Sequence, residues 1–109
     1  MVSVCMIYIK IHETEHGAMV AMCDEKVLGK IYKDKKTGMT LDLIKYSEFY
    51  KGELFSAKKG VEILKGTYLY SGNIVGEEAV SVVIKAGLAT GAEIKKIDDV
   101  PSIQIYKIL

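Results

Sequence analysis

The sequence predicts a single α+β domain over residues 1–109, with a largely antiparallel sheet and two main helices packed on it. Three observations predict this class. Short apolar segments rich in Val, Ile, Met and Tyr recur between polar turns, which is typical of strands. Two segments carry apolar residues at helical spacing and end at a glycine. With 109 residues, of which 50% are hydrophobic and 27% charged, the chain can bury its own core and is not disordered.

The first predicted element is a β-hairpin with strands over about 2–11 and 18–23. A pairing centred on Thr14 sets three pairs opposite each other, namely Cys5 with Cys23, Ile7 with Ala21, and Ile9 with Met19. Both faces of the hairpin are apolar, so we expect cover on two sides, or helices on one side and a partner on the other. Two cysteines do not form a disulfide framework, and we expect both to stay reduced.

The loop of this hairpin reads HETEH over residues 12–16, a match to H-E-x-x-H, the helical zinc motif of metallopeptidases. That site needs a helix, because only the helical period brings His12 and His16 to one metal ion. The flanking segments favour strands, Gly17 follows directly, and the 2 histidines of the chain leave none for a third ligand. We therefore predict a polar turn here, with no metal site and no cofactor.

The middle of the chain predicts a helical turn and a second hairpin. In CDEKVLGK, Asp24 can cap the free amides of the turn, and Gly29 can adopt the left-handed conformation that ends it. KIYK and GMTLDLI read as two strands joined by the polar turn DKKTG. The next stretch, SEFYKGELF, mixes aromatic residues with glycine, and we predict an irregular edge or loop.

The C-terminal half predicts two helices and two strands. One helix starts at the cap Ser56 and stops at Gly66, and the other runs over about 75–86 and ends at Gly87. Between them, TYLYSGN alternates like a strand, although its position also suits a connector. AEIKKI and SIQIYKIL read as short strands separated by DDVP, with Pro101 at the start of the second because proline cannot donate to a ladder.

Composition narrows the classes of function. The net charge of +1 argues against a strongly electrostatic nucleic-acid binder. All 15 basic residues are lysines, so contacts to anions must use point charges or backbone amides rather than the bidentate grip of arginine. No apolar run is long enough to span a membrane, and the N-terminus lacks the features of a signal peptide. We expect a cytoplasmic protein.

The first candidate site is Cys23 with Asp24, at the end of a predicted strand. A thiol beside a helix N-terminus can have a lowered pKa, which favours a nucleophile or a redox thiol. The simpler interpretation is a buried small side chain followed by a helix cap, and it is favoured because no histidine is placed as a base.

The second candidate is the turn GNIVGEE, which opens the second helix. Its free amides could receive a phosphate or a carboxylate near Asn73, Gly76 and Glu77. However, Glu77 and Glu78 place negative charge beside any anion, so ordinary capping by Asn73 or by the glutamates is the favoured interpretation.

The third candidate is KIYKDKKTG on the second predicted hairpin, with Lys30, Lys33, Lys35 and Lys36 around Tyr32. Basic side chains with an interleaved aromatic residue are the elements of contact with single-stranded or loop RNA. Lysine-rich turns also protect sheet edges and keep a protein soluble, and this interpretation leads by a narrow margin.

Five pieces of the chain, in order, resemble the archaeal domain-of-unknown-function 424 family. They are VAMCDEKVLGK at 20–30, EFYKGE at 48–53, GNIVGEEAV at 72–80, AGL at 86–88 and DVPSIQI at 99–105. The resemblance implies an archaeal cytoplasmic protein with a connection to RNA or translation, and it supplies no activity. Where the family pattern is expected to read Val-Pro-His-Ala-Gln, this chain carries Ser102, so any role of that histidine is absent or altered here.

These observations favour a non-enzymatic cytoplasmic binding module that contacts RNA or a ribonucleoprotein through residues 30–36. Two alternatives stay open. One is a small enzyme or ligand-binding domain that uses Cys23, Asp24 and the helix start over 73–77. The other is a structural subunit of a protein complex that uses the apolar faces of the first hairpin. The sequence does not define an oligomeric state.

Overall fold

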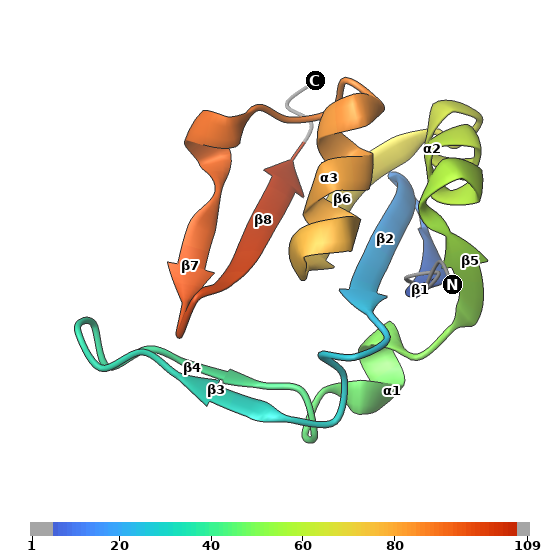
Figure 1. Ribbon diagram of the computed structural model, residues 1–109. Helices are drawn as coiled ribbons and strands as arrows, with labels where there is room; N and C mark the ends of the chain where they lie inside the picture. The colour runs from blue at the N-terminus through green and yellow to red at the C-terminus, as the bar shows by residue number, and fades with distance from the viewer. Residues whose placement is uncertain (1–5, 107–109) are drawn as a thin grey trace, which may run out of the picture.

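The computed structural model describes residues 6–106, which form one six-stranded sheet with the order β5-β1-β2-β6-β8-β7, a separate hairpin and three helices (Figure 1). The strands of the sheet are β1 (Met6–Thr14), β2 (Gly17–Asp24), β5 (Glu53–Ser56), β6 (Leu69–Val75), β7 (Lys95–Ile97) and β8 (Val100–Tyr106). The other elements are β3 (Ile31–Lys33), β4 (Thr40–Asp42), α1 (Ser47–Tyr50), α2 (Ala57–Lys65), α3 (Glu77–Lys85) and a 3-10 turn over Gly91–Glu93. Within residues 6–106, only the β2–β6 pairing of this sheet is parallel, so the predicted α+β class with a largely antiparallel sheet is confirmed.

Two apolar clusters cover the two faces of the sheet. On one face, α2 and α3 bury a cluster that includes Ile9 and Val83. On the other face, the β3–β4 hairpin, the turn after β2 and α1 bury a second cluster that includes Cys23, Leu43 and Tyr50. Both faces of the β1–β2 hairpin are therefore covered, as predicted, and segments of this same chain provide the cover. Within residues 6–106, no helix is long and apolar enough to cross a membrane.

Local sequence signals correctly identified most elements. The Ser56 hydroxyl accepts a hydrogen bond from the Lys59 amide at 3.3 Å and caps α2, which ends at Gly66. Gly87 follows α3 with a φ of +77°, the left-handed conformation that glycine tolerates best. The β3–β4 hairpin forms where the sequence predicts it, the two predicted C-terminal strands are β7 and β8, and most of TYLYSGN lies in the strand β6.

The predicted register of the first hairpin is wrong. Ile7 lies opposite Asp24 rather than Ala21, and Ile9 lies opposite Met22 rather than Met19. The reason is that β1 continues to Thr14, which pairs with Gly17 across a two-residue turn instead of ending in a longer loop. The register differs from the predicted one by three residues. Because this number is odd, the even-numbered residues of β2 share a face of the hairpin with Ile7 and Ile9, whereas the prediction placed the odd-numbered residues there. Cys23 lies opposite Tyr8, and Cys5 lies outside the described residues.

The segment predicted as an irregular edge is partly ordered. Residues 47–50 form the short helix α1, and residues 53–56 form β5, which pairs with the outer edge of β1. Gly52 allows this close approach, because a Cβ atom there would collide with the backbone of Ile9. The predicted edge position is confirmed, because β5 is the outermost strand on this side of the sheet. The predicted irregular structure is wrong, because the local sequence does not reveal that β1 is the strand with which β5 pairs.

Candidate functional site

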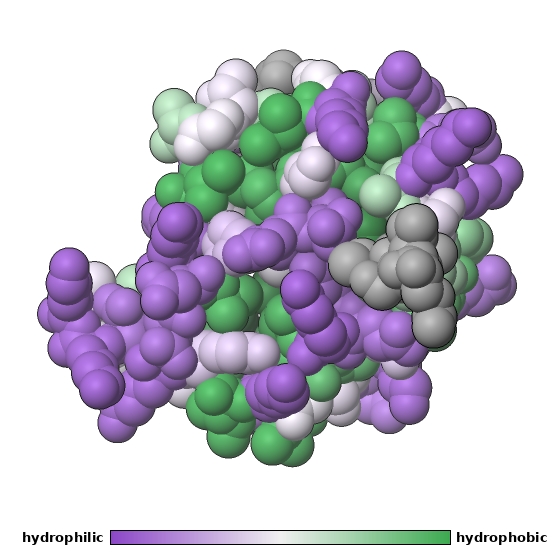
Figure 2. All heavy atoms as spheres, in the orientation of Figure 1, coloured by the Kyte–Doolittle hydropathy of each residue, from purple (hydrophilic) through white to green (hydrophobic). Residues whose placement is uncertain are grey.

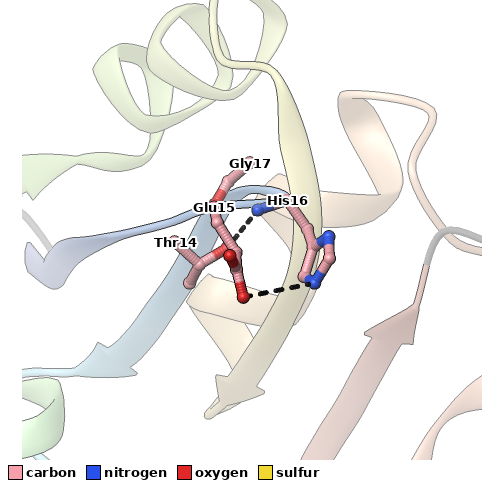
Figure 3. Close-up of polar contacts among 4 residues, drawn as sticks. All are labelled: Thr14, Glu15, His16 and Gly17. Atoms are coloured by element: carbon pink, nitrogen blue, oxygen red, sulfur yellow. Dashed lines mark hydrogen bonds and ion pairs between the residues drawn. The ribbon is translucent and has the colours of Figure 1, made fainter.

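The HETEH segment forms a strand end and a turn, as predicted, and its two histidines contact different neighbours. The Thr14 hydroxyl donates to the Gly17 carbonyl at 2.6 Å and accepts from the His16 amide at 3.2 Å, which closes the turn (Figure 3). His12 stacks on the Phe49 ring of α1 with a centroid distance of 4.7 Å. His16 lies against the Tyr70 ring at 5.3 Å. Within residues 6–106, no group of three His, Cys, Asp or Glu side chains is placed to hold a metal ion.

Cys23 is a buried structural thiol at the end of β2. Its side chain is fully buried in the cluster beneath the hairpin, and its thiol contacts the Asp24 carbonyl oxygen at 3.5 Å. Burial raises the pKa of Cys23 to about 12, and the negative charge of Asp24 adds to this rise. The favoured interpretation of Cys23 as a buried small side chain is therefore confirmed, and the alternative of a reactive thiol with a lowered pKa is wrong, because the site is apolar and buried.

Cys23 is expected to react with a thiol reagent only when the protein unfolds. We expect this in a Cys5→Ser variant, in which Cys23 is the single cysteine. A thiol pKa near 12 instead of 9.0 leaves about a thousandfold less thiolate at pH 8, and burial blocks access as well. The measurement compares labelling rates in native and denatured protein. Rapid labelling of the native protein would instead support the enzymatic alternative.

Asp24 caps a helix, although not the turn that follows it. Its carboxylate accepts hydrogen bonds from the amides of Glu78 at 3.0 Å and Ala79 at 2.8 Å, in the first turn of α3. The turn after β2 instead closes on the Asp24 main-chain carbonyl, which accepts from Val27 and Leu28. Burial raises the pKa of Asp24, and the two amide hydrogen bonds oppose this rise. The chain thus supplies its own carboxylate at the helix start that we considered for an external anion.

The other residues of the predicted helix start have separate roles. Gly76 is the residue before α3, with a φ of +107°, and a Cβ atom there would lie 2.3 Å from the Asp24 carboxyl carbon. Glu77 is exposed at the first position of the helix. Asn73 does not cap α3, because it lies within β6, where it pairs with Gln104 of β8. The capping role predicted for Asn73 is therefore wrong, since β6 continues past it to Val75.

The lysines of the third candidate are exposed, whereas its aromatic residue faces inward. Lys30, Lys33, Lys35 and Lys36 are all exposed on or beside the β3–β4 hairpin. Tyr32 is half-buried and packs against the cluster that contains Cys23, and burial is the main cause of its raised pKa. Strand alternation explains the difference, because Lys33 and Tyr32 point to opposite faces of the hairpin. Tyr32 is therefore a packing residue, and the structure favours the lysines rather than Tyr32 as the exposed contacts of this candidate.

A hydrogen bond fastens the tip of this hairpin to the main sheet. The Asp34 carboxylate accepts from the Asp98 amide at 3.4 Å, and it also accepts from the Thr37 hydroxyl at 2.7 Å and the Thr37 amide at 3.0 Å. Asp98 and Asp99 have φ values of +49° and +64° and form the tight β7–β8 turn, which points at the hairpin in Figure 1. The Thr37 hydroxyl is the main cause of the lowered pKa of Asp34.

Between the hairpin and the sheet lies a cavity of about 370 Å³. Polar side chains of the sheet form one wall, and hairpin and α1 residues form the other. The sheet wall includes Asn73, Lys95, Ser102, Gln104 and Tyr106, and the opposite wall includes Met39, Leu41 and Tyr50. Tyr50 is 8% exposed, and burial raises its pKa to about 12, so it is a neutral phenol at physiological pH. We regard this cavity as the candidate functional site.

Asn73 is the polar residue of this cavity that the candidate sites included. Ser102 was noted only as a departure from the expected family pattern, and the other polar residues were missed. The signal was present in SIQIY, where Ser102, Gln104 and Tyr106 alternate with buried Ile103 and Ile105. A period of two with polar residues on one face indicates a strand with one face open to a ligand or to solvent. The Ser102 hydroxyl donates to the Lys95 carbonyl at 3.3 Å, so this position joins β8 to β7 at the cavity wall.

Known proteins resemble this chain over nearly its whole length. The model of the protein family described as "Protein of unknown function (DUF424)" matches residues 11–108, so the predicted family resemblance is confirmed, and the cavity lies inside the matched region. A crystal structure of an uncharacterized conserved protein from Methanopyrus kandleri is similar, with 29% sequence identity and a TM-score of 0.77. The similarity covers 95% of this chain and 96% of that chain. The curated proteins contain no match.

Proposed function

This chain belongs to the DUF424 family, and we propose that it is a non-enzymatic binding module that contacts single-stranded RNA through the β3–β4 hairpin. One observation carries the proposal. Lys30, Lys33, Lys35 and Lys36 are exposed on a hairpin that is fastened to the sheet and forms one wall of the cavity. Lysines contact phosphates as point charges, and these contacts position a strand without reading its sequence.

The distribution of charge supports this role for the hairpin. Residues 30–38 contain four lysines and one aspartate, a net charge of +3, whereas the whole chain has a net charge of +1. Figure 2 shows hydrophilic side chains gathered over the hairpin tip. The positive charge is therefore local, and we expect modest affinity that rises when the protein binds inside a larger assembly.

The other two candidate sites, Cys23 with Asp24 and the start of α3, both have structural roles, which supports a module without catalysis. Cys23 is buried with a raised pKa, and Asp24 uses its carboxylate to cap α3. A catalytic nucleophile needs access to substrate, and a general acid or base needs a proton path to it. The enzymatic alternative would have to use other residues.

Binding to a single-stranded oligoribonucleotide is expected to weaken steeply with salt, because phosphate contacts release counterions. Replacing Lys30, Lys33, Lys35 and Lys36 with glutamine should lower affinity at low salt. The slope of log K against log salt should fall by roughly 0.7 for each phosphate that the variant no longer neutralises. Preference among RNA sequences should change little, since these lysines do not read bases. Fluorescence anisotropy over a salt series measures all three quantities.

A matched control removes the same charge from the helical face. Lys58, Lys59, Lys65 and Lys85 are exposed on α2 and α3, and their replacement by glutamine should leave the salt slope close to that of the wild type. Equal reductions in affinity in the two quadruple variants would indicate an unspecific charge effect and would contradict the proposal. Isolation from native cells gives an independent check. Partners that stay bound after nuclease treatment would favour a protein-interaction role instead.

A further inference from the structure

We propose that the cavity between the sheet and the β3–β4 hairpin binds a single nucleobase, whose polar edge is read by the side-chain amides of Asn73 and Gln104. The base could belong to an unstacked nucleotide of a bound RNA strand, and for this source the inference rests on the proposed function. A free nucleotide presents the same chemistry, and the experiment below separates the two sources.

The two amides are placed as a pair by the strand register. Asn73 of β6 lies directly opposite Gln104 of β8 in an antiparallel ladder, so both side chains leave the same face of the sheet. Cβ atoms at such positions are about 4.5–5.5 Å apart, close enough for both amides to reach one small ligand. Within residues 6–106, neither side-chain amide has a hydrogen-bond partner. Their hydrogen-bonding capacity is therefore available.

The chemistry of an amide pair fits a base better than a phosphate. Each carboxamide offers both donors and an acceptor, and the edge of a nucleobase presents both donors and acceptors. A phosphate offers acceptors only. Glu93 and Lys95 both line the cavity, so formal charge does not bias it toward an anion. The exposed hairpin lysines outside the cavity suit the phosphates of the same nucleotide chain.

The opposite wall fits the flat faces of a base. Leu41 and Tyr50 contribute an aliphatic and an aromatic surface across from the amides. Tyr106 lines the cavity at the end of β8 and is 71% exposed, which leaves its ring free to stack on a base. A cavity of about 370 Å³ lies at the lower end of the usual range for small-molecule sites. This size suits one base rather than a folded RNA element.

The test uses two kinds of probe with the full-length protein. In the first arm, each of the four ribonucleoside monophosphates is titrated into isotopically labelled protein, and backbone chemical shifts are followed by NMR. In the second arm, a short oligoribonucleotide is compared with an abasic strand of the same length. Both arms are repeated with an Asn73→Leu/Gln104→Leu variant. Ser71→Ala is the matched control, because Ser71 lies on the same strand and face but outside the cavity.

We expect at least one monophosphate to shift the signals of β6 and β8 residues that line the cavity. The double variant should bind that nucleotide on the order of 5- to 150-fold more weakly, whereas Ser71→Ala should bind it normally. Thermal unfolding establishes that each variant is folded, and the single Gln104→Leu variant, at an exposed position, replaces the double variant if needed.

Two results would separate this inference from the proposed function. If the abasic strand binds as tightly as the complete strand and no monophosphate shifts the cavity signals, the base site is wrong, although the lysine contacts stand. If a monophosphate binds the cavity but no oligonucleotide binds at low salt, the base site stands for free nucleotides and the RNA proposal fails.

Discussion

A Gly76→Ala variant is expected to be destabilised by about 2–6 kcal/mol, because the change introduces both backbone strain and a steric collision. Gly76 has φ and ψ of 107° and 155°, a region that only glycine occupies readily. An alanine Cβ there would lie 2.3 Å from the Asp24 carboxyl carbon. Asp24 is 1% exposed and is held by the amides of Glu78 and Ala79, so it cannot move aside without losing the helix cap.

Gly87→Ala is the matched control for this prediction. Gly87 also has a positive φ, of +77°, but an added Cβ atom there meets no atom of the described residues within 4 Å. The strain alone should cost about 1–2 kcal/mol. Urea unfolding of the two variants and the wild type measures both changes. If both variants lose equal stability, the contact between Gly76 and Asp24 does not contribute as argued.

An Asp24→Ala variant is expected to lose about 2–4 kcal/mol, because two amides at the start of α3 would be left without their acceptor in a buried site. An Asp24→Asn variant keeps one carbonyl oxygen at the same place and should lose about 1–2 kcal/mol. The free energy of unfolding measures both effects. A destabilisation in Asp24→Ala no greater than that in Asp24→Asn would show that the hydrogen bonds to α3 contribute little.

The same carboxyl group also predicts a dependence of stability on pH. The pKa of Asp24 in the folded state lies above its ordinary value of 3.8, chiefly because of burial. Between 3.8 and the folded pKa, the folded state binds more protons than the unfolded state, so the free energy of unfolding falls as the pH rises. This contribution is complete below 3.8 and is lost above the folded pKa.

Comparison of the wild type with Asp24→Asn isolates the contribution of Asp24. The pKa of Asp34 is lowered, so its contribution has the opposite sign and disappears as the pH falls. Since Asp34 is present in both proteins, its contribution cancels in the difference. The difference in the free energy of unfolding between wild type and variant should therefore decrease as the pH rises from 3.8. A difference that is constant with pH would contradict the raised pKa of Asp24.

Short-range signals in the sequence determined the class of the fold and most of its elements. Ser56 and Gly66 bound α2, and Gly87 follows α3, because caps and stops depend on residues within one helical turn. Polar turns located the hairpins in the same way, and they were sufficient to place HETEH at a turn rather than on a helix. The exposed hairpin lysines also followed from the sequence, because a charged turn rarely becomes buried.

Tertiary structure alone decided which residues meet across long stretches of chain. The amides that Asp24 binds belong to residues more than 50 positions later, and nothing within its own turn reveals them. Likewise, Asn73 and Gln104 become neighbours only through the β6–β8 register, and Tyr50 reaches their cavity from a helix on another segment. Local patterns specify the face on which a side chain lies. Its partner depends on strand order and register, which arise from packing of the whole core.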